Sequence, residues 1–288
     1  MPKIIFTSGI SPDYDDIPEV RCEFPKRYLK TVTEAIGDCL IYYEPRKNGG
    51  KMSYYATARV NRIEKHPTNP DHYYMIVSDY LDFIEPVPFR IGTVFMESSL
   101  EGGNGMPNLG SLQWAVRRLP DAEFSAILQS GFKHSMIGPT KIDLSVAEEP
   151  STYNRPINTE IIGRPFRDRA FRENIHSAYN ETCAFTGLRL SNDQGLFEVH
   201  AAHIRAVEES GPDSRRNGVA LTQTIHWLFD RGALSLEDDG KILQVDKLVP
   251  HKVKALLHPD GYARFPDAAH LKPHPQFLRF HRENRFIG

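Results

Sequence analysis

The chain has 288 residues, of which 40% are hydrophobic and 25% charged, a composition typical of a globular protein long enough for two domains. No apolar run reaches the ~18 residues that a membrane-spanning helix needs, and the opening MPKIIFTSGI lacks the features of a secretory signal peptide, so we expect a cytoplasmic protein. The net charge of −2 gives no general sign of nucleic-acid binding, and three scattered cysteines (Cys22, Cys39 and Cys183) fit a reducing compartment and argue against a cysteine-based zinc site.

The first ninety residues are rich in β-branched and aromatic side chains. Three runs, 37–46, 53–66 and 72–90, have the composition of strands. Turn-forming residues separate them at 48–50 (Asn-Gly-Gly) and 67–70 (Pro-Thr-Asn-Pro). Closely spaced strands of this kind predict a small β-barrel.

A glycine-rich stretch at 100–110 ends this pattern, and apolar residues at helical spacing then predict a helix over 111–131. Residues 138–164 are rich in Pro, Ser, Thr and acids without a sustained period, which is typical of a linker. We therefore expect a first domain at 1–137 and a second at 165–288.

The second half is expected to begin with a helix at 166–181 that has Phe171, Ile175 and Tyr179 on one face. A strand over 196–204, a long polar loop over 205–217 and a helix within 218–232 follow. Gly232 occupies the position at which a helix is typically closed.

Four residues of this half combine into a chemical pattern. His203 closes the predicted strand, Asn217 follows in the loop, and His226 lies in the predicted helix with Asp230 one turn later. Each has an ordinary structural explanation when taken alone: a packed strand histidine, a turn, or a surface pair. Their order on strand, loop and helix favours a site that hydrolyses phosphodiester bonds.

Histidine suits the proton transfer of this reaction because its pKa lies near neutrality, so His203 is the candidate general base. Asn217 is the candidate clamp that holds the loop through backbone hydrogen bonds. His226 is the candidate metal ligand. Asp230 shares its helical face and is expected either to bind the metal as well or to orient His226.

A surplus of basic residues also falls in this half, with 19 Lys and Arg against 17 Asp and Glu over 151–288. It is sharper over 251–288, with seven Lys or Arg and five His against three acids, and a local basic surface that meets a phosphate backbone and a solvated tail explain this segment equally well.

From about Arg164 to the C-terminus the sequence resembles the HNH, or ββα-metal, endonuclease family. The matching segments are FRDRAFRENIHSAYNETCAFTG, AAHI, RNGVALTQTIHWLFDRG and LRFHRENRF. The resemblance implies that His203 is the base, that Asn217 shapes the loop and that His226 binds a divalent cation, with Mg²⁺ or Mn²⁺ expected. Many members carry Asp or His immediately before the base, where this chain has Ala202. We expect Asp230, ahead of His200, to supply the missing ligand.

Residues 37–90 resemble the EVE-type domains of the PUA-like superfamily, through GDCLIYYEPR, SYYATARVNRIEKHPTNPDHYYMIVSDY and FIEPVPFR. Members of this superfamily are associated with binding modified bases, which implies a pocket of aromatic side chains. Trp114 is the first candidate because QWAVRR places it beside two arginines, and Tyr42 and Tyr54 follow. Core packing is an alternative explanation for each of these rings.

Together these features predict an α+β protein with an N-terminal PUA/EVE-like small β-barrel, flanking helices and a C-terminal ββα-metal HNH domain. The expected function is that of a modification-dependent endonuclease, which flips out and recognises 5-methylcytosine or 5-hydroxymethylcytosine in double-stranded DNA. Because one HNH centre cuts one strand, a homodimer is expected. Two alternatives stay open: an HNH nuclease or nickase directed by sequence or structure, and a catalytically inactive nucleic-acid-binding module.

Overall fold

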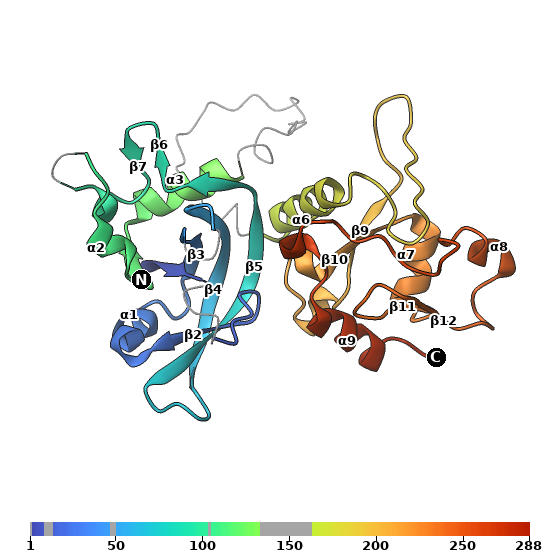
Figure 1. The fold of residues 1–288 in the computed structure, drawn as a ribbon, viewed down its shortest axis with the longest axis horizontal. Helices are drawn as coiled ribbons and strands as arrows, with labels where there is room; N and C mark the ends of the chain where they lie inside the picture. The colour runs from blue at the N-terminus through green and yellow to red at the C-terminus, as the bar shows by residue number, and fades with distance from the viewer. Residues whose placement is uncertain (1, 9–13, 47–49, 103–104, 133–162) are drawn as a thin grey trace, which may run out of the picture. The chain divides into compact units, whose positions relative to one another are not determined.

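The computed structural model describes residues 2–8, 14–46, 50–102, 105–132 and 163–288. The chain divides into two compact units, Met1–Ala170 and Phe171–Gly288, each of which combines strands with helices (Figure 1). This confirms the mixed α+β class. The predicted linker lies almost wholly outside the described residues, and the predicted domain boundaries stay predictions.

The first unit is built on one curled, six-stranded sheet (Figure 1). Its order is β2–β5–β4–β3–β1–β8, with the bounds β1 Lys3–Thr7, β2 Arg21–Pro25, β3 Cys39–Glu44, β4 Ser53–Lys65, β5 His72–Pro88 and β8 Val116–Leu119. Strand β1 runs parallel to β3, and every other neighbouring pair is antiparallel. Register shifts interrupt the pairing of β4 with both neighbours, and such bulges bend strands and increase their twist.

The three strands expected over residues 37–90 are therefore confirmed as β3, β4 and β5. The barrel is confirmed only in part, because β2 and β8 form the two ends of a curled, open sheet. A short hairpin of β6 (Arg90–Ile91) and β7 (Val94–Phe95) follows β5.

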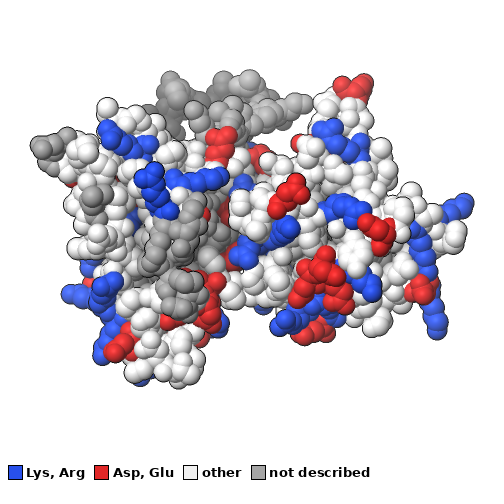
Figure 2. Space-filling view, in the orientation of Figure 1, with Lys and Arg blue, Asp and Glu red and all other residues white. Residues whose placement is uncertain are grey.

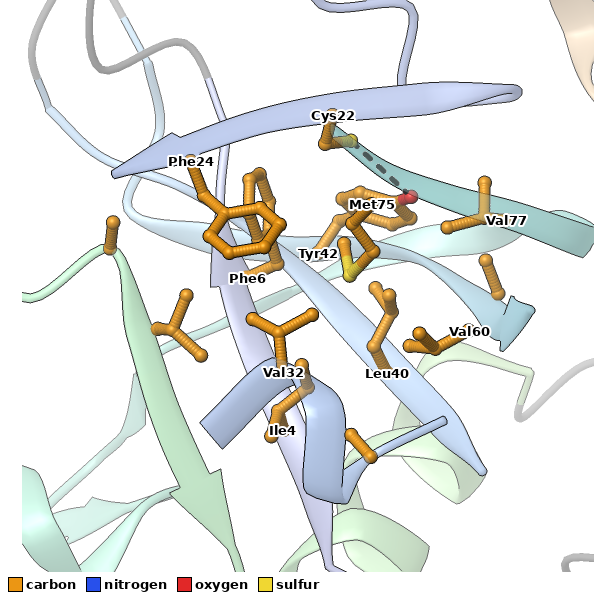
Figure 3. Close-up of a cluster of buried hydrophobic side chains, with 14 of the residues drawn as sticks. Ile4, Phe6, Cys22, Phe24, Val32, Leu40, Tyr42, Val60, Met75 and Val77 are labelled. Atoms are coloured by element: carbon orange, nitrogen blue, oxygen red, sulfur yellow. Dashed lines mark hydrogen bonds between the residues drawn. The ribbon is translucent and has the colours of Figure 1, made fainter. Parts of the chain in front are cut away.

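Both faces of this sheet are buried. Successive strand residues point to opposite faces, so Ile4 and Phe6 of β1 join one core while Ile5 joins the other. Helix α1 (Leu29–Glu34) contributes Val32 to the first core, which Figure 3 shows in close-up. Helix α3 (Asp121–Gly131) contributes buried side chains to the second. Burial on both sides explains the unbroken apolar stretches 4–6 in β1 and 40–43 in β3.

The helix predicted over 111–131 is wrong in its first half. Helix α2 ends at Leu112 (Leu109–Leu112), and Val116–Leu119 is strand β8, paired with β1. Pro120 then lies at the N-terminus of α3, where its missing N–H leaves no helical hydrogen bond unmade. Sheet pairing thus overrides the apparent helical spacing of the apolar residues before Pro120.

The second unit places two antiparallel strands and a helix in sequence. Strand β9 (His200–His203) pairs with β10 (Gly218–Leu221), and helix α7 (Gln223–Asp230) follows. The remaining elements are α6 Arg164–Ala178, which begins in the first unit, β11 Leu234–Leu236, β12 Ile242–Gln244, α8 His251–Lys254 and α9 Pro275–Asn284.

The predicted apolar face of α6 is confirmed, since Phe171, Ile175 and Tyr179 are all buried. The region expected to hold the site helix contains both β10 and α7. Gly232 follows α7 with a φ of 70°, and a Cβ there would lie 1.9 Å from the Arg285 carbonyl oxygen, so only glycine fits. Among the helices that the structure describes, none combines the length and apolar character needed to cross a bilayer.

Candidate active site

The orientation of His203 is determined by two contacts within the second unit. The residue ends β9 opposite Gly218, and its ring stacks on Phe171 with centroids 3.8 Å apart and planes inclined by 11°. Its Nε2 lies 2.9 Å from Oδ1 of Asp213, whose side chain is fully buried, while the His203 side chain keeps 18% of its surface exposed. The imidazole is thus held on one edge and one face and still reaches solvent.

Neither of these partners was predicted as a site residue. Phe171 was expected only on the buried face of a helix. Asp213 is one of three acids in the loop 205–217, with Glu208 and Glu209, and its place in the sequence does not distinguish it from the other two. Only the folded path of the loop brings one of the three to the histidine.

Asn217 spans the loop between β9 and β10. Its side chain is fully buried, Oδ1 accepts a hydrogen bond from the Arg205 backbone N–H at 2.9 Å, and Nδ2 donates to the carbonyl oxygens of Arg205 at 3.0 Å and Pro212 at 2.9 Å. Three hydrogen bonds therefore join the end of the loop to its beginning and to the residue before Asp213. A clamp on the loop would use these hydrogen bonds, and the clamp role of Asn217 stays a prediction.

The glycine after Asn217 has a packing role. A Cβ at Gly218 would lie 2.3 Å from Cδ1 of Ile175 and 2.8 Å from Cζ of Phe171. The absence of a side chain allows α6 to approach β10 closely, which brings Phe171 beneath the His203 ring. The Asn-Gly pair thus serves the site through a buried amide and a close backbone approach.

His226 and Asp230 lie one turn apart on the exposed face of α7. His226 Nε2 is 3.3 Å from Asp230 Oδ2. Burial lowers the pKa of His226 below its ordinary value of 6.5, and the imidazoles of His200 and His203 lower it further, whereas the Asp230 carboxylate opposes the shift. His226 is therefore neutral near pH 7, which is the form that binds a metal ion.

The donor set of this pair fits a divalent cation. Adjacent ligands around an ion with bonds of ~2.1 Å are about 3 Å apart, close to the separation of the His226 nitrogen and the Asp230 oxygen. In the described part of the chain, no third His, Cys or acid brings a ligand atom within 4.8 Å of both. A pair of protein ligands leaves room for water and phosphate oxygens.

The position before His203 carries no metal-ligating side chain, as the sequence indicated. Ala202 is fully buried, while His200, two residues earlier on the same strand, is exposed. The ring centroids of His200 and His226 are 5.7 Å apart with the planes perpendicular, and among the described residues the nitrogens of His200 do not come within 4.8 Å of both His226 and Asp230. The preference for Asp230 over His200 agrees with these distances, and the ligand roles stay predictions.

A second set of metal-ligand side chains occurs in the first unit, where Asp15, Glu23 and His66 bring ligand atoms within 4.8 Å of one another. His66 Nδ1 accepts backbone N–H groups from Thr68 at 3.2 Å and Asn69 at 3.0 Å. The ring proton is therefore on Nε2, the nitrogen 4.0 Å from the Glu23 carboxylate, and that nitrogen has no lone pair for a metal. The set is better explained as a hydrogen-bonded polar cluster.

The three aromatic candidates of the first unit differ in exposure. Tyr42 and Tyr54 are fully buried, with hydroxyls that donate to the Pro18 carbonyl oxygen and to the Glu97 carboxylate, both at 2.7 Å. Alternation along β3 and β4 directs these rings into the two cores, and burial removes both from the candidates for a base pocket.

Trp114 is 59% exposed, and its role stays a prediction. Its backbone carbonyl accepts hydrogen bonds from Thr7 Oγ1 at 3.2 Å and from Arg117 Nη1 at 3.0 Å. Arg117 is itself buried in an ion pair with Glu97. Buried groups thus fix the backbone that carries the exposed Trp114 ring. Arg117 is held in its ion pair with Glu97 and is not available to contact a ligand beside that ring.

The charges on the second unit are of both signs. On the face seen in Figure 2, Lys and Arg side chains are interspersed with Asp and Glu. Among the described residues of this unit many charged side chains are paired, such as Arg282 with Asp238 at 2.8 Å and Lys254 with Asp246 at 2.6 Å. The basic surplus of the sequence is therefore partly neutralised within the unit.

Comparison with known proteins places this site in a recognised segment. The family model described as HNH endonuclease matches residues 183–237, which include His203, Asn217, His226 and Asp230. The resemblance to HNH endonucleases is confirmed for this segment. No curated protein matches the chain.

Two of the solved structures that the chain matches are restriction endonucleases of low identity to it. The modification-dependent restriction endonuclease TagI is 15% identical with a TM-score of 0.33, over 99% of this chain and 81% of that one. The type IV phosphorothioation-dependent restriction endonuclease ScoMcrA is 12% identical with a TM-score of 0.22, over 80% of this chain and 50% of that one. At these TM-scores the overall likeness carries no argument about either unit.

Proposed function

We propose that this chain, which carries an HNH endonuclease segment at residues 183–237, is a metal-dependent DNA endonuclease directed by a modified base. The observation that carries the proposal is the convergence of His203 and the His226–Asp230 pair on adjacent elements of the second unit. His200, on the same strand as His203, has its ring centroid 5.7 Å from that of His226, so β9 and α7 lie beside each other at the site. The succession of β9, β10 and α7 supports a ββα-metal arrangement.

The chemistry follows from the side chains. A divalent ion such as Mg²⁺ or Mn²⁺ on His226 and Asp230 would supply Lewis-acid stabilisation of charge on the phosphate oxygens. His203 accepts a proton from the attacking water, because it is the imidazole that reaches solvent with its ring fixed. Asn217 holds the two ends of the loop together and so keeps the strand end that carries His203 in a fixed position.

For the first unit we propose recognition of 5-methylcytosine or 5-hydroxymethylcytosine in double-stranded DNA by base flipping. The sequence resemblance of residues 37–90 to EVE-type domains and the curled sheet support this assignment. The exposed Trp114 offers a ring for stacking, which is worth roughly 1–3 kcal/mol per base and offsets the few kcal/mol that flipping costs.

The experiment that tests the proposal is cleavage of a plasmid pair, one unmodified and one carrying modified cytosines, with Mg²⁺ or Mn²⁺ and with EDTA. We expect the modified plasmid alone to be cut, and only without EDTA. Equal cutting of both plasmids would keep the nuclease and overturn modified-base recognition, leaving a sequence- or structure-directed nuclease. No cutting of either would favour the inactive binding module, for which the absence of a ligand at Ala202 is the specific argument.

The His203→Ala variant tests the base within the same assay. Loss of a general base is expected to lower the cleavage rate by on the order of 10²- to 10⁴-fold while DNA binding is retained. His270→Ala is a matched control, because His270 is an exposed histidine outside the site. Wild-type cleavage by His203→Ala would show that another group takes the proton. If each site cuts one strand, a double-strand cut needs two sites, and we therefore propose a homodimer. Light scattering with and without DNA measures the oligomeric state.

A further inference from the structure

We propose that Asp213 is the positioning residue of the general base: its carboxylate accepts the Nε2–H of His203, so that Nδ1 is the nitrogen that takes the proton from water. This rests on the proposed nuclease function of the same site. The contact is 2.9 Å from Nε2 to Oδ1, a normal length for a charge-assisted hydrogen bond.

The burial of the two partners supports this assignment. The Asp213 side chain is fully buried, whereas His203 keeps 18% of its side chain exposed. A buried carboxylate is costly unless it is hydrogen-bonded, so its contact with His203 has a clear stabilising role. The exposed part of the imidazole is then left for water and substrate.

The loop is built to hold Asp213 in this place. Asn217 donates a hydrogen bond to the carbonyl oxygen of Pro212, the residue immediately before Asp213, at 2.9 Å. Phe171 restrains His203, the other member of the hydrogen bond, because its ring lies flat against the His203 ring. Asn217 thus fixes the backbone next to Asp213, and the Asp213 carboxylate in turn orients the His203 ring.

The choice of nitrogen follows from hydrogen-bond chemistry. An ionised carboxylate only accepts, so the ring nitrogen that faces it carries the proton in the neutral imidazole. The lone pair is then on Nδ1. In the reaction, the O–H bond of the attacking water breaks and its proton moves to Nδ1, while its oxygen bonds to phosphorus. The bridging P–O bond breaks, and the leaving oxygen takes a proton from solvent.

The ring nitrogens of His203 report this arrangement directly by long-range ¹H–¹⁵N correlation NMR on the full chain without DNA or metal. The His203→Gln spectrum identifies the signals. We expect the Nε2–H form in the wild type and a shift toward the Nδ1–H form in Asp213→Asn, because a side-chain amide is able to donate. Glu208→Gln is the matched control, since it removes an exposed acid from the same loop and leaves the tautomer unchanged.

Cleavage kinetics give the second readout. Asp213→Asn is expected to lower kcat by on the order of 10²- to 10⁴-fold with KM and the Kd for Mn²⁺ unchanged, and Asp213→Glu to recover part of the loss. An Nδ1–H tautomer in the wild type, or an unchanged tautomer in Asp213→Asn, overturns the proposal whether or not the protein cuts DNA. An Nε2–H tautomer that depends on Asp213, together with cleavage by the wild type, supports it. The same tautomer in a wild type that fails to cut would keep the orientation of the ring by Asp213 and overturn the proposed function and the role of His203 as base.

Discussion

The imidazole Nε2 of His226 lies 3.3 Å from a carboxylate oxygen of Asp230, one turn further along α7. Asp230 is exposed and His226 is half-buried, on a helix whose other side, with Ile225, Leu228 and Phe229, is buried. Because the buried face fixes the position of the helix, the backbone that carries both side chains is already in place before a metal ion binds.

Removal of either member of this pair is expected to weaken metal binding. We expect Asp230→Ala to raise the Kd for Mn²⁺ by at least about tenfold and His226→Ala by more, since each loses one of two protein ligands. Isothermal titration calorimetry measures both, with Asp267→Ala as the control for an exposed acid elsewhere in the unit. An unchanged Kd in both variants would place the ion on other residues.

Asn217→Ala is expected to destabilise the second unit. The substitution removes three hydrogen bonds and leaves a buried carbonyl of Pro212 and partly buried backbone groups of Arg205 without this partner, a loss of roughly 2–4 kcal/mol in the free energy of unfolding. Asn217→Asp keeps the acceptor and loses both donors, so an intermediate loss is expected. Urea unfolding followed by circular dichroism measures the difference, and a change below about 0.5 kcal/mol in Asn217→Ala would contradict the clamp.

Trp114→Ala is expected to weaken binding to modified DNA selectively, by roughly 5- to 150-fold for the loss of one stacked base. Trp114→Phe keeps a ring and should retain part of the affinity. Met106→Ala provides the control, because Met106 is another large exposed apolar residue of the same unit. Fluorescence anisotropy with modified and unmodified duplexes measures the effect, and equal losses on both would indicate a backbone contact instead.

Acid is expected to destabilise the second unit through His281. Burial lowers the pKa of this histidine to about 4, and the nearby Arg285 and Arg282 lower it further, while its bond to the Phe229 carbonyl oxygen opposes the shift. Since the folded pKa lies below the unfolded value of 6.5, stability is complete above pH 6.5 and is lost as the pH falls toward 4, by about 2 kcal/mol at pH 5.

Urea unfolding of the wild type and of His281→Gln at pH 8 and pH 5 isolates this contribution. The variant is expected to be less stable than the wild type at pH 8, because the bond between Ser235 and His281 is disturbed, and the gap should narrow by about 2 kcal/mol at pH 5. His270→Gln is the control for an exposed histidine. A gap that stays constant with pH would show that His281 does not carry the acid sensitivity.

The pattern of residues was sufficient to predict the long strands β3, β4 and β5, because each is a run of β-branched and aromatic residues bounded by turn chemistry. It was not sufficient around Pro120, where the apolar residues of β8 also fit a helix. Pairing with β1 decides between these conformations, and β1 lies more than a hundred residues earlier in the chain.

What the sequence by itself determined is the order of the site: a histidine, an asparagine, a second histidine and an aspartate, spaced so that strand, loop and helix each carry their own part. The tertiary structure alone decided which tyrosines are buried, which of three loop acids reaches His203 and which ring lies beneath it. The physical reason is that periodicity records the face of a strand or helix, whereas the partner across a loop or core depends on the packing of distant segments against one another.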